Sequence, residues 1–363
     1  MRIRRSILLD AVSKCCLIAD KKDVLLSNVK LKWLYNRVYC SALNEAEALT
    51  VDNECSADEP GESVVNADRL KKILSKSKSD TVSLLSKPGN LVVNFGSIKT
   101  KLPTVGTFPD LEYTNYLVAF YCEPKQIKSL YERLYSFIGE NESRKNLMGL
   151  HVNVKGQTVT LTGADAFRIG RDKIENVGIS EMEGILPKQS FKNIASIFGS
   201  SEKGFNVCYG SKSFLCFGDG LKYKSSAIDA EYPNLERLLQ VPDYQCKVDS
   251  KSLFEATDML FTMCNKDTRH TMKAKIKNDS IEFVLHTTAD VEGSVEIDGS
   301  TNGVDTDIGL NVSYFNQISA IFKKSDMVVG IGFTKSEHPV MLSCDCPEYQ
   351  DYKAILMPVK LQW

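Results

Sequence analysis

The clearest pattern of apolar and polar positions lies in residues 186–198, where one face of a predicted helix is apolar. Phe191, Ile194, Ala195 and Phe198 have the three- and four-residue spacing of side chains on one side of an α-helix. Pro187 suits the first turn of such a helix, because a residue there needs no N–H donor for an intrahelical bond. The pattern predicts an amphipathic helix that packs one face on a core.

The same pattern occurs twice more, in Val65–Leu74 and Leu310–Phe322. In each copy an apolar residue is followed five positions later by a bulky apolar residue, and an isoleucine comes three positions after that. The copies lie about 120 residues apart, a period far longer than that of solenoid repeats. We therefore predict one domain repeated three times, at 1–115, 116–241 and 242–363.

A second amphipathic helix is predicted before each copy, at Ser6–Cys16, Pro124–Ile138 and Asp249–Cys264. Alternating apolar residues predict strands between and after these helices. The expected strand pairs are Val29–Trp33 with Val38–Cys40, Thr81–Leu85 with Leu91–Phe95, Leu150–Val154 with Val159–Leu161, Phe205–Cys208 with Phe214–Phe217, Ala274–Ile276 with Ile281–Leu285, and Met327–Phe333 with Val340–Ser343. Each domain then has two helices and about eight strands, an α+β fold, and we expect all six helices on one side of their sheets.

Composition narrows the class of protein. The chain has 363 residues, of which 43% are hydrophobic and 25% charged, as in soluble globular proteins. No apolar run reaches the roughly 18 residues that a membrane span needs. Eleven cysteines are scattered without a CxxC pair, which favours reduced thiols over disulfides or zinc. We expect a cytoplasmic protein with no membrane segment, metal or cofactor.

The net charge is only −1, but basic residues gather on the second helix of each domain. Segments 66–78, 187–198 and 311–324 contain one acidic residue, Asp68. Their basic residues are Arg69, Lys71, Lys72, Lys76, Lys78, Lys188, Lys192, Lys323 and Lys324. Lysines are common on any solvated helix face, so one such helix would mean little. Three equivalent helices of one sign favour a shared surface that attracts phosphate without reading base sequence.

Acidic residues gather elsewhere. Residues 45–62 contain seven of them and no basic residue. A run of like charge is typical of a solvated segment, so we predict a loop here.

The sequence gives little support to an enzyme. The chain has four histidines, His151, His270, His286 and His338. They have no metal-ligand spacing to one another or to a cysteine, and no phosphate-binding glycine loop or nucleophile motif is present. Asp165 and Arg168 could be a catalytic pair. An Asp after a strand with an Arg three residues on more often forms a turn and a surface ion pair.

Five short segments stand out: GADAFRIG (163–170), ILPKQSF (185–191), YPNLERLL (232–239), LNVSYF (310–315) and ILMPVKL (355–361). In order and spacing they resemble the bacterial DNA sliding clamps, the beta subunits of DNA polymerase III. FPDL (108–111) is similar to the end of that family's first domain. The resemblance implies a head-to-tail homodimeric ring around duplex DNA. It also implies a replicative DNA polymerase and an ATP-dependent clamp loader as partners, and no catalysis.

The family has one peptide-binding groove per chain, which implies a groove here for peptides of the form Gln-x-x-Leu-Phe. By position its residues would be Leu147, Ala164, Ala166, Phe167, Arg168, Ile169, Pro233, Arg237, Leu238, Asn311, Tyr314, Val340, Met357, Pro358, Val359, Lys360 and Leu361. We expect the stems of Arg168 and Arg237 to pack on the peptide while their guanidinium groups stay hydrated. The family usually has Thr-Asp-Gly-His-Arg at 164–168 and ends at the equivalent of Leu361, so Gln362 and Trp363 are additions that bear on partner preference.

The resemblance also implies DNA contacts and a dimer interface. The predicted DNA-binding residues are Lys21, Lys22, Arg69, Lys71, Lys72, Lys76, Arg144, Lys145, Lys188 and Lys192. The predicted interface joins the first domain of one chain to the third domain of the other through Ile98, Thr100, Leu102, Leu260 and Met263.

Two other functions stay open. The chain could keep the clamp fold but act as a monomeric regulator or decoy that binds clamp-partner peptides, and its mass in solution would separate this from a ring. It could also be an enzyme of the replication apparatus, which a hydrolase or nuclease assay with a divalent metal would test.

Overall fold

The computed structural model describes residues 1–175, 177–264, 270–286, 292–323 and 327–361. The chain forms two compact units. The first contains Met1–Lys128, Val154–Gln157 and Val177–Ile228, and the second contains Ser129–Asn153, Thr158–Asn176 and Asp229–Trp363. Each unit therefore includes part of the predicted second domain.

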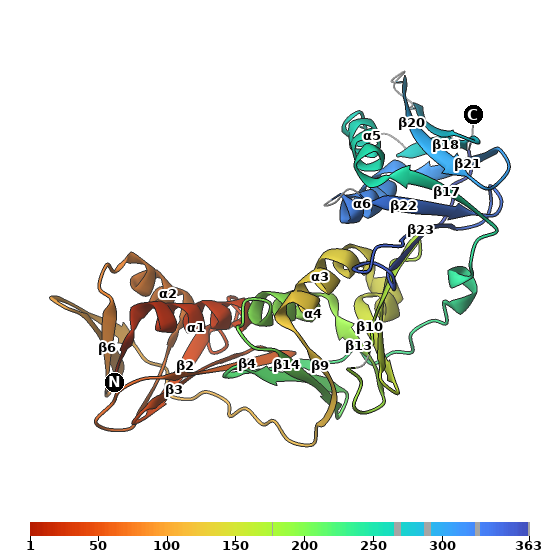
Figure 1. Cartoon of the computed structure of the whole chain (residues 1–363). Coiled ribbons are helices and arrows are strands. Elements are labelled where there is room, and N and C mark those ends of the chain that lie inside the picture. Colours follow the sequence, from red (N-terminus) through yellow and green to blue (C-terminus); the bar gives the residue numbers. More distant parts are fainter. Residues whose placement is uncertain (176, 265–269, 287–291, 324–326, 362–363) are drawn as a thin grey trace. The chain divides into compact units, whose positions relative to one another are not determined.

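The first unit has helices on one face of an antiparallel sheet. The helices α1 (Arg5–Ile18), α2 (Ala67–Lys76) and α4 (Lys188–Phe198) cover that face (Figure 1). The sheet order is β5-β2-β3-β4-β16-β15-β14-β9. Its strands are β2 (Asn28–Leu34), β3 (Arg37–Leu43), β4 (Glu47–Glu54), β5 (Gly61–Asn66), β9 (Leu117–Cys122), β14 (Phe205–Gly210), β15 (Ser213–Gly218) and β16 (Leu221–Ser226). Because β4 pairs with β16, one sheet continues from the predicted first domain into the second.

A smaller sheet completes the first unit. Its order is β1-β6-β7-β8. The strands are β1 (Arg2–Arg4), β6 (Thr81–Lys87), β7 (Asn90–Phe95) and β8 (Ile98–Pro103), and β13 (Met182–Pro187) leads into α4. Strand β8 is therefore at the edge of its sheet.

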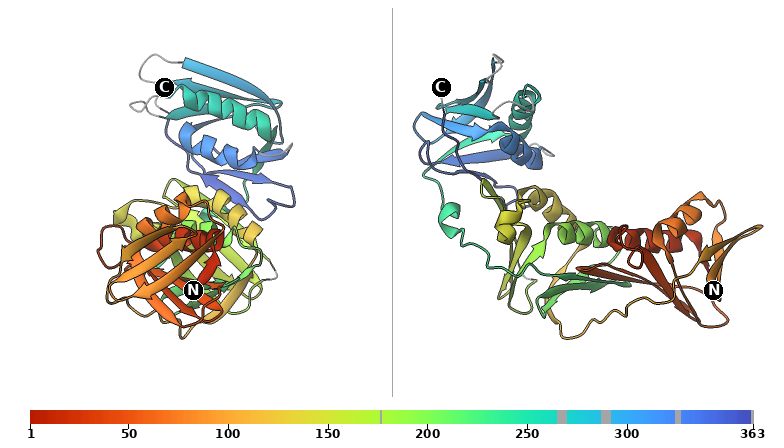
Figure 2. Two further views of the ribbon diagram at one scale, coloured as in Figure 1. Left: turned by 90° about the vertical axis from the view of Figure 1, so that its left-hand side faces the viewer. Right: turned by 180° about the vertical axis from the view of Figure 1, so that it is seen from behind.

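The second unit repeats this design. Its sheet runs in the order β10-β11-β12-β24-β23-β22-β17-β20-β19-β18-β21. The strands are β10 (Gly149–Lys155), β11 (Thr158–Ala164), β12 (Arg168–Ile174), β17 (Tyr244–Asp249), β18 (Thr271–Ile276), β19 (Ser280–His286), β20 (Glu292–Thr301), β21 (Thr306–Asn311), β22 (Val328–Phe333), β23 (Val340–Cys344) and β24 (Lys353–Leu356). The helices α5 (Ser250–Thr262) and α6 (Val312–Phe322) lie side by side on one face (Figure 2). The 3₁₀ turns η1 (Tyr135–Phe137), η2 (Glu142–Leu147) and η3 (Glu236–Leu239) complete the unit. Helix α3 (Pro124–Leu134) begins in the first unit and continues into the second after Lys128.

The predicted number of helices and strands in each repeat is confirmed for the described residues. Elements β1–β8 with α1 and α2, β9–β16 with α3 and α4, and β17–β24 with α5 and α6 follow one another along the chain. Each group has two α-helices and eight strands, as the repeat predicted. The helix predicted to reach Ile138 becomes a 3₁₀ turn after Leu134.

The three repeated helices begin two residues later than predicted. Val65, Leu186 and Leu310 are instead the next-to-last residues of the preceding strands, where their side chains are buried. Pro187 is the N-cap residue of α4 and not part of its first turn. An apolar residue is equally compatible with the end of a strand and with the start of a helix, so the periodicity of apolar residues alone does not locate the boundary between the two elements.

The prediction of a solvated loop at 45–62 is wrong. Strand β4 and the start of β5 lie in this segment. Ala48, Leu49 and Val51 are buried in the core, and the acidic Glu47 is only 7% exposed. Apolar residues that face the core hold the strand in place, and the buried acid has hydrogen-bond donors around it. These contacts outweigh the tendency of like charges to remain solvated.

The remaining expectations concern membranes and thiols. Among the described residues, no helix is long and apolar enough to cross a membrane. All eleven cysteines are free thiols.

Candidate functional site

An apolar cluster lies on four adjacent strands of the second unit, β11, β12, β24 and β23. Ala164, Ile169, Ile355 and Met341 are register partners, one on each strand. Leu147 joins them, and none of the five is more than 8% exposed. Because directly opposite residues in a sheet are about 5 Å apart, the four side chains form a continuous apolar row.

One segment partly covers this row. Tyr232, Leu235, Leu238 and Leu239 are half-buried and pack against it from η3 and the residues before it. Sequence reasoning named Leu238 but missed the other three, together with Met341 and Ile355. The apolar residues of YPNLERLL could have predicted the segment that packs on the row. The pairing of β12 with β24 could not have been predicted, because the two strands are far apart in the sequence.

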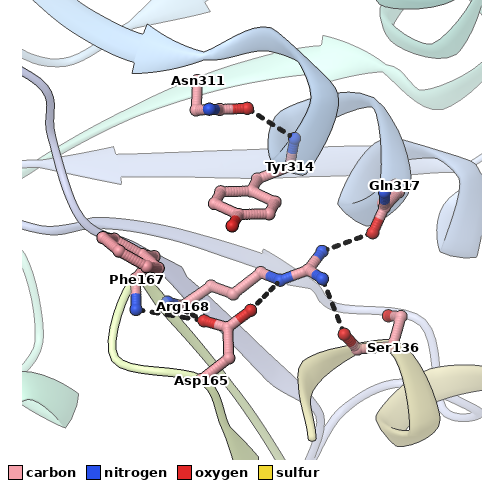
Figure 3. Close-up of polar contacts among 7 residues, drawn as sticks. All are labelled: Ser136, Asp165, Phe167, Arg168, Asn311, Tyr314 and Gln317. Carbon is pink, nitrogen blue, oxygen red and sulfur yellow. Dashed lines mark hydrogen bonds and ion pairs between the residues drawn. The ribbon is translucent and has the colours of Figure 1, made fainter. Parts of the chain in front are cut away.

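The turn between β11 and β12 is built on Asp165. One carboxylate oxygen, Oδ1, accepts the N–H groups of Phe167 and Arg168, both at 3.0 Å. The other oxygen, Oδ2, accepts Nε–H of Arg168 at 2.9 Å (Figure 3). An Asp that bonds the backbone two residues on is the usual way to stabilise such a turn. Ala166 completes it with φ of +77°, in the left-handed region.

The predicted turn and ion pair are therefore present, but the pair is buried and not on the surface. The Arg168 side chain is 7% exposed. Its Nη1–H donates to Gln317 Oε1 and its Nη2–H to the Ser136 carbonyl, both at 2.6 Å (Figure 3). The expectation of a hydrated Arg168 guanidinium is wrong, because each of its nitrogens has a protein partner.

Two neighbouring residues of β12, Arg168 and Ile169, have their side chains on opposite faces of the sheet. Ile169 joins the apolar cluster, while Arg168 turns toward α6 and η1. Successive side chains of a strand point to opposite faces, so the two residues belong to different environments. Val340 and Leu356 are register partners across β23 and β24, and Leu356 pairs with Arg168.

Phe167 and the C-terminal segment lie beside Arg168. The Phe167 side chain is 57% exposed, and its ring centroid is 6.0 Å from that of Tyr314. The Phe167 carbonyl accepts the Met357 N–H at 2.8 Å, and the Gly309 carbonyl accepts the Val359 N–H at 2.9 Å. Residues 357–361 therefore extend from the Asp165 turn to β21.

The other predicted groove residues have these environments. Asn311 caps α6 by accepting the Tyr314 N–H at 3.0 Å. Ala166, Arg237 and Lys360 are exposed, and Pro233, Pro358, Val359 and Leu361 are partly exposed. Gln362 and Trp363 lie outside the described residues.

The predicted DNA-binding residues are solvent-accessible to different degrees. In the first unit Lys21, Lys22, Arg69, Lys72, Lys76 and Lys192 are exposed, whereas Lys71 and Lys188 are partly exposed. Asp68, the acid on α2, lies 3.6 Å from Lys21. Arg144 and Lys145 of the second unit are exposed. Lys324 lies outside the described residues.

The predicted interface residues differ in exposure. Ile98, on the edge strand β8, is 62% exposed, and Thr100 and Met263 are partly exposed. Leu102 and Leu260 are buried within the chain. The exposed apolar side chains near the end of α5 are instead Met259 and Phe261, at 60% and 36%.

Within the described part of the chain, no three His, Cys, Asp or Glu side chains are placed to hold a metal ion together.

Known proteins match both the sequence and the fold. Residues 122–234 match the family model of the DNA polymerase III beta subunit, central domain. The beta sliding clamp of Rickettsia bellii is 22% identical and aligns with 98% of this chain and 97% of its own length. The crystal structure of the DNA polymerase III beta subunit of Pseudomonas aeruginosa superposes with a TM-score of 0.92 at 20% identity, covering 99% of this chain and all of that one. The Streptococcus pyogenes beta subunit gives 0.93 at 18% identity, covering 99% of each chain.

The fold of the chain is thus that of the bacterial sliding clamps. Residues 122–234 match the central domain of the DNA polymerase III beta subunits, and the whole chain is similar in sequence and fold to bacterial beta sliding clamps.

Proposed function

We propose that this chain works as a DNA sliding clamp: two copies close into a ring around duplex DNA and hold a replicative polymerase at the primer end. The observation that carries this proposal is the set of exposed basic residues on α2 and α4, both on the helix-bearing face of the first unit (Figure 1). The proposed work is tethering, which raises the effective concentration of a bound partner, and it requires no bond to be made or broken by this chain.

The basic residues suit contact with a phosphate backbone. Arg69, Lys72, Lys76 and Lys192 are exposed, so their charges can approach DNA without an internal rearrangement. Such contacts release counterions and carry no sequence information. Binding should therefore weaken steeply with salt and be independent of base sequence, as sliding requires.

Retention on DNA tests the ring. A closed ring leaves linear DNA at its ends but stays on closed circular DNA, so the loaded protein should persist much longer on the circle. Charge reversal at Lys72 and Lys192 should weaken loading and lower the salt dependence. A matched control reverses Lys32 and Lys222, which are exposed on strands β2 and β16. Equal retention on linear and circular DNA would rule out the ring.

Two open strand edges support the homodimer. Strand β8 ends the small sheet, and β17 covers only Gly299–Thr301 of β20, so among the described strands Gly293–Asp298 pairs with β19 alone. Unpaired backbone at such edges can pair with another chain. We infer that β8 of one chain meets this part of β20 in the other, with Ile98, Met259 and Phe261 packing nearby.

Mass in solution tests the dimer and its alternative together. Light scattering at micromolar concentration should give twice the chain mass of 40.5 kDa, and Ile98→Arg should shift the mass toward one chain. A monomeric regulator or decoy would give the single-chain mass for both proteins. No observation favours that alternative over the clamp.

The apolar row and its cover are the proposed partner site. We infer that a Gln-x-x-Leu-Phe peptide places its Leu and Phe against the row, between Leu238 and the segment 357–361. Burial of two such side chains supplies roughly 3–6 kcal/mol before ordering costs, so an isolated peptide should bind on the order of micromolar. Polymerase and an ATP-dependent clamp loader would dock through such motifs.

Peptide titration tests this site. A fluorescent Gln-x-x-Leu-Phe peptide should bind the wild-type chain and lose affinity with Leu238→Asp, which places a charge in the half-buried cover. Glu236→Gln on the same turn is the control, since Glu236 is exposed. Absence of binding to the wild-type chain would mean that the cluster is not a peptide site.

A further inference from the structure

The first unit has a cavity of about 400 Å³ on the face of its sheet that points away from the helices. Residues 104–116, which join β8 to β9, run along this face (Figure 1). Residues 109–113 of this segment line the cavity together with side chains of β2, β3, β4 and β16. Tyr39 and Thr50 belong to this face, because they alternate with Cys40 and Leu49, which are buried on the side that α1 covers. A cavity of this size suits one small molecule.

Polar register partners cross the cavity from one strand to the next. Lys30 on β2 is opposite Ser41 on β3, which is opposite Thr50 on β4. Thr50 is in turn opposite Lys222 on β16. Lys32 lies two residues from Lys30 and therefore on the same face of β2. Two hydroxyl side chains thus lie between basic residues of β2 on one side and of β16 on the other.

The hydroxyl groups of Ser41, Thr50 and Tyr113 form a chain that has one proton to spare. The oxygen atoms of Ser41 and Thr50 are 3.1 Å apart, and those of Thr50 and Tyr113 are 3.0 Å apart. Burial raises the pKa of Tyr113 to about 12, so its phenol keeps its proton at neutral pH. Three O–H groups joined by two hydrogen bonds leave one O–H to donate to a ligand. Phosphate and carboxylate oxygens are strong acceptors for such a donor.

The segment 104–116 is attached to the sheet at two places beside the cavity. Besides the bond between Tyr113 and Thr50, the Asp110 carboxylate lies 3.2 Å from Lys30 Nζ. The Tyr113 ring is thus held next to the basic residues, with Lys222 Nζ 5.9 Å from its centre. A ring held in this way is a preformed surface for a planar group, so little binding energy is lost in ordering it.

The charges that line the cavity favour an anion. Asp52 is paired with Arg37, at 2.6 Å between Oδ2 and Nη2, and Asp219 accepts a backbone N–H at 3.2 Å. By contrast, Lys32 and Lys222 are exposed, and neither forms an ion pair with an acid among the described residues. Their strands are three spacings of about 4.8 Å apart, so the two side chains approach a group between them from opposite sides. Two ammonium groups and a spare O–H therefore remain for a ligand.

We propose that this cavity binds a small phosphate ester that carries a planar ring, as a nucleoside monophosphate does. The phosphate lies between Lys32 and Lys222 and accepts the spare hydroxyl proton, while the planar ring packs on Tyr113. The site is on the sheet face opposite the basic helices, and the proposed peptide site is in the other unit. The inference therefore adds a small-molecule ligand to the proposed function and does not depend on it.

Calorimetric titration of the full chain at low salt tests the site with three probes. Adenosine monophosphate should bind with a dissociation constant in the high micromolar to millimolar range, because few groups contact it. Adenosine, which lacks the phosphate, and ribose 5-phosphate, which lacks the planar ring, should each bind at least about twofold more weakly. A wild-type chain that binds none of the three probes at millimolar concentration would overturn the proposal.

Variants of the two lysines locate the binding. Lys32→Gln and Lys222→Gln each remove one ammonium group from an exposed position, so both proteins should fold normally. Each should bind adenosine monophosphate about two- to fivefold more weakly than the wild type. Lys224→Gln is the matched control and should leave the affinity unchanged. Lys224 lies two residues from Lys222 on the same face of β16, but it does not line the cavity.

Variants of Tyr113 separate its ring from its hydroxyl. Tyr113→Phe keeps the ring, whereas Tyr113→Leu removes both groups and should bind adenosine monophosphate about two- to tenfold more weakly than Tyr113→Phe. The two variants should bind ribose 5-phosphate equally, and thermal melting verifies their folding. If Lys32→Gln, Lys222→Gln and Tyr113→Leu all bind adenosine monophosphate as the wild type does, the nucleotide binds elsewhere and the proposed site is wrong. The clamp proposal is unaffected by that result, because retention on circular DNA is measured without these probes.

Discussion

The guanidinium carbon of Arg168 lies 4.4 Å from the centre of the Tyr314 ring. The same side chain donates hydrogen bonds to Asp165, to Gln317 and to the Ser136 carbonyl. One residue at the start of β12 thus contacts α6 and η1 at once. Removing a charge from water is costly, but here a carboxylate, an amide oxygen and a carbonyl compensate the guanidinium.

Removal of this side chain should destabilise the second unit. Arg168→Ala leaves the Asp165 carboxylate, which is 14% exposed, without its ion-pair partner. Loss of one member of a buried pair costs about 3–5 kcal/mol. Urea unfolding should show this loss, whereas Lys251→Ala, which breaks the exposed pair with Glu255, should cost less than about 1 kcal/mol. Equal effects of the two substitutions would mean that the Arg168 network contributes little.

Relief of backbone strain should stabilise the same turn. Ala166 has φ of +77°, a conformation that costs a residue with a Cβ atom about 1–2 kcal/mol relative to glycine. Glycine also makes the unfolded chain more flexible, which lowers the free energy of unfolding by about 0.5–1 kcal/mol. Ala166→Gly should therefore raise the free energy of unfolding by about 0.5–1 kcal/mol. Ala164→Gly in the adjacent buried strand is the control and should lower it, and a loss with both variants would contradict the strain argument.

The sequence was most informative where a pattern is local. The spacing of Phe191, Ile194 and Phe198 predicted α4, and all three side chains are buried. The repetition of this spacing predicted the number of helices and strands, because each repeat must bury the same kind of apolar face. The apolar alternation in β10 and β11 likewise predicted a hairpin next to the candidate site.

The sequence was least informative where an environment comes from distant segments. The partner Gln317 lies 149 residues from Arg168, so nothing near Arg168 predicted its burial. Alternation shows that Arg168 and Ile169 face opposite sides of β12, but it does not show what covers each side. The segment 45–62 was misinterpreted for the same reason, since most of the side chains that donate hydrogen bonds to Glu47 come from α4 and β16.

Loss of the buried Glu47 carboxylate should destabilise the first unit. Its oxygens accept Ser190 Oγ–H at 2.9 Å, Asn193 Nδ2–H at 3.0 and 3.1 Å, and the Tyr223 hydroxyl. Burial, reinforced by this carboxylate, raises the pKa of Tyr223 well above its usual value, so the phenol remains a donor. Glu47→Ala leaves these donors without an acceptor and should cost about 3–5 kcal/mol.

A graded set of variants tests this role of Glu47. Glu47→Gln keeps one acceptor oxygen and the side-chain length, so it should cost less than Glu47→Ala in urea unfolding. Glu45→Ala, at an exposed position two residues earlier, should stay within about 0.5 kcal/mol of wild type. A Glu47→Ala protein as stable as Glu45→Ala would show that the buried carboxylate is dispensable.

The Asp172 carboxyl should make the stability of the second unit depend on pH. Its side chain is 4% exposed, and one oxygen lies 2.7 Å from Arg133 Nε. Burial raises the pKa of Asp172 to about 6, because lost hydration outweighs the attraction of Arg133 and the hydrogen bond from the Lys173 N–H. A carboxyl whose pKa is higher in the folded state than in the unfolded state stabilises the fold while it is protonated. That contribution is full below the unfolded pKa of about 4 and is lost as the pH rises through about 6.

Comparison with a variant that cannot titrate isolates this contribution. Asp172→Asn resembles the protonated acid at every pH, so the difference in unfolding free energy, wild type minus variant, should fall by about 2 kcal/mol between pH 4 and pH 7. Urea unfolding of both proteins at several pH values measures this difference. The control is Asp351→Asn, an aspartate that is one of the causes of the raised Asp172 pKa; it should lower the midpoint of the fall slightly and not abolish it. A difference that instead rises with pH would mean that the ion pair with Arg133 outweighs the loss of hydration.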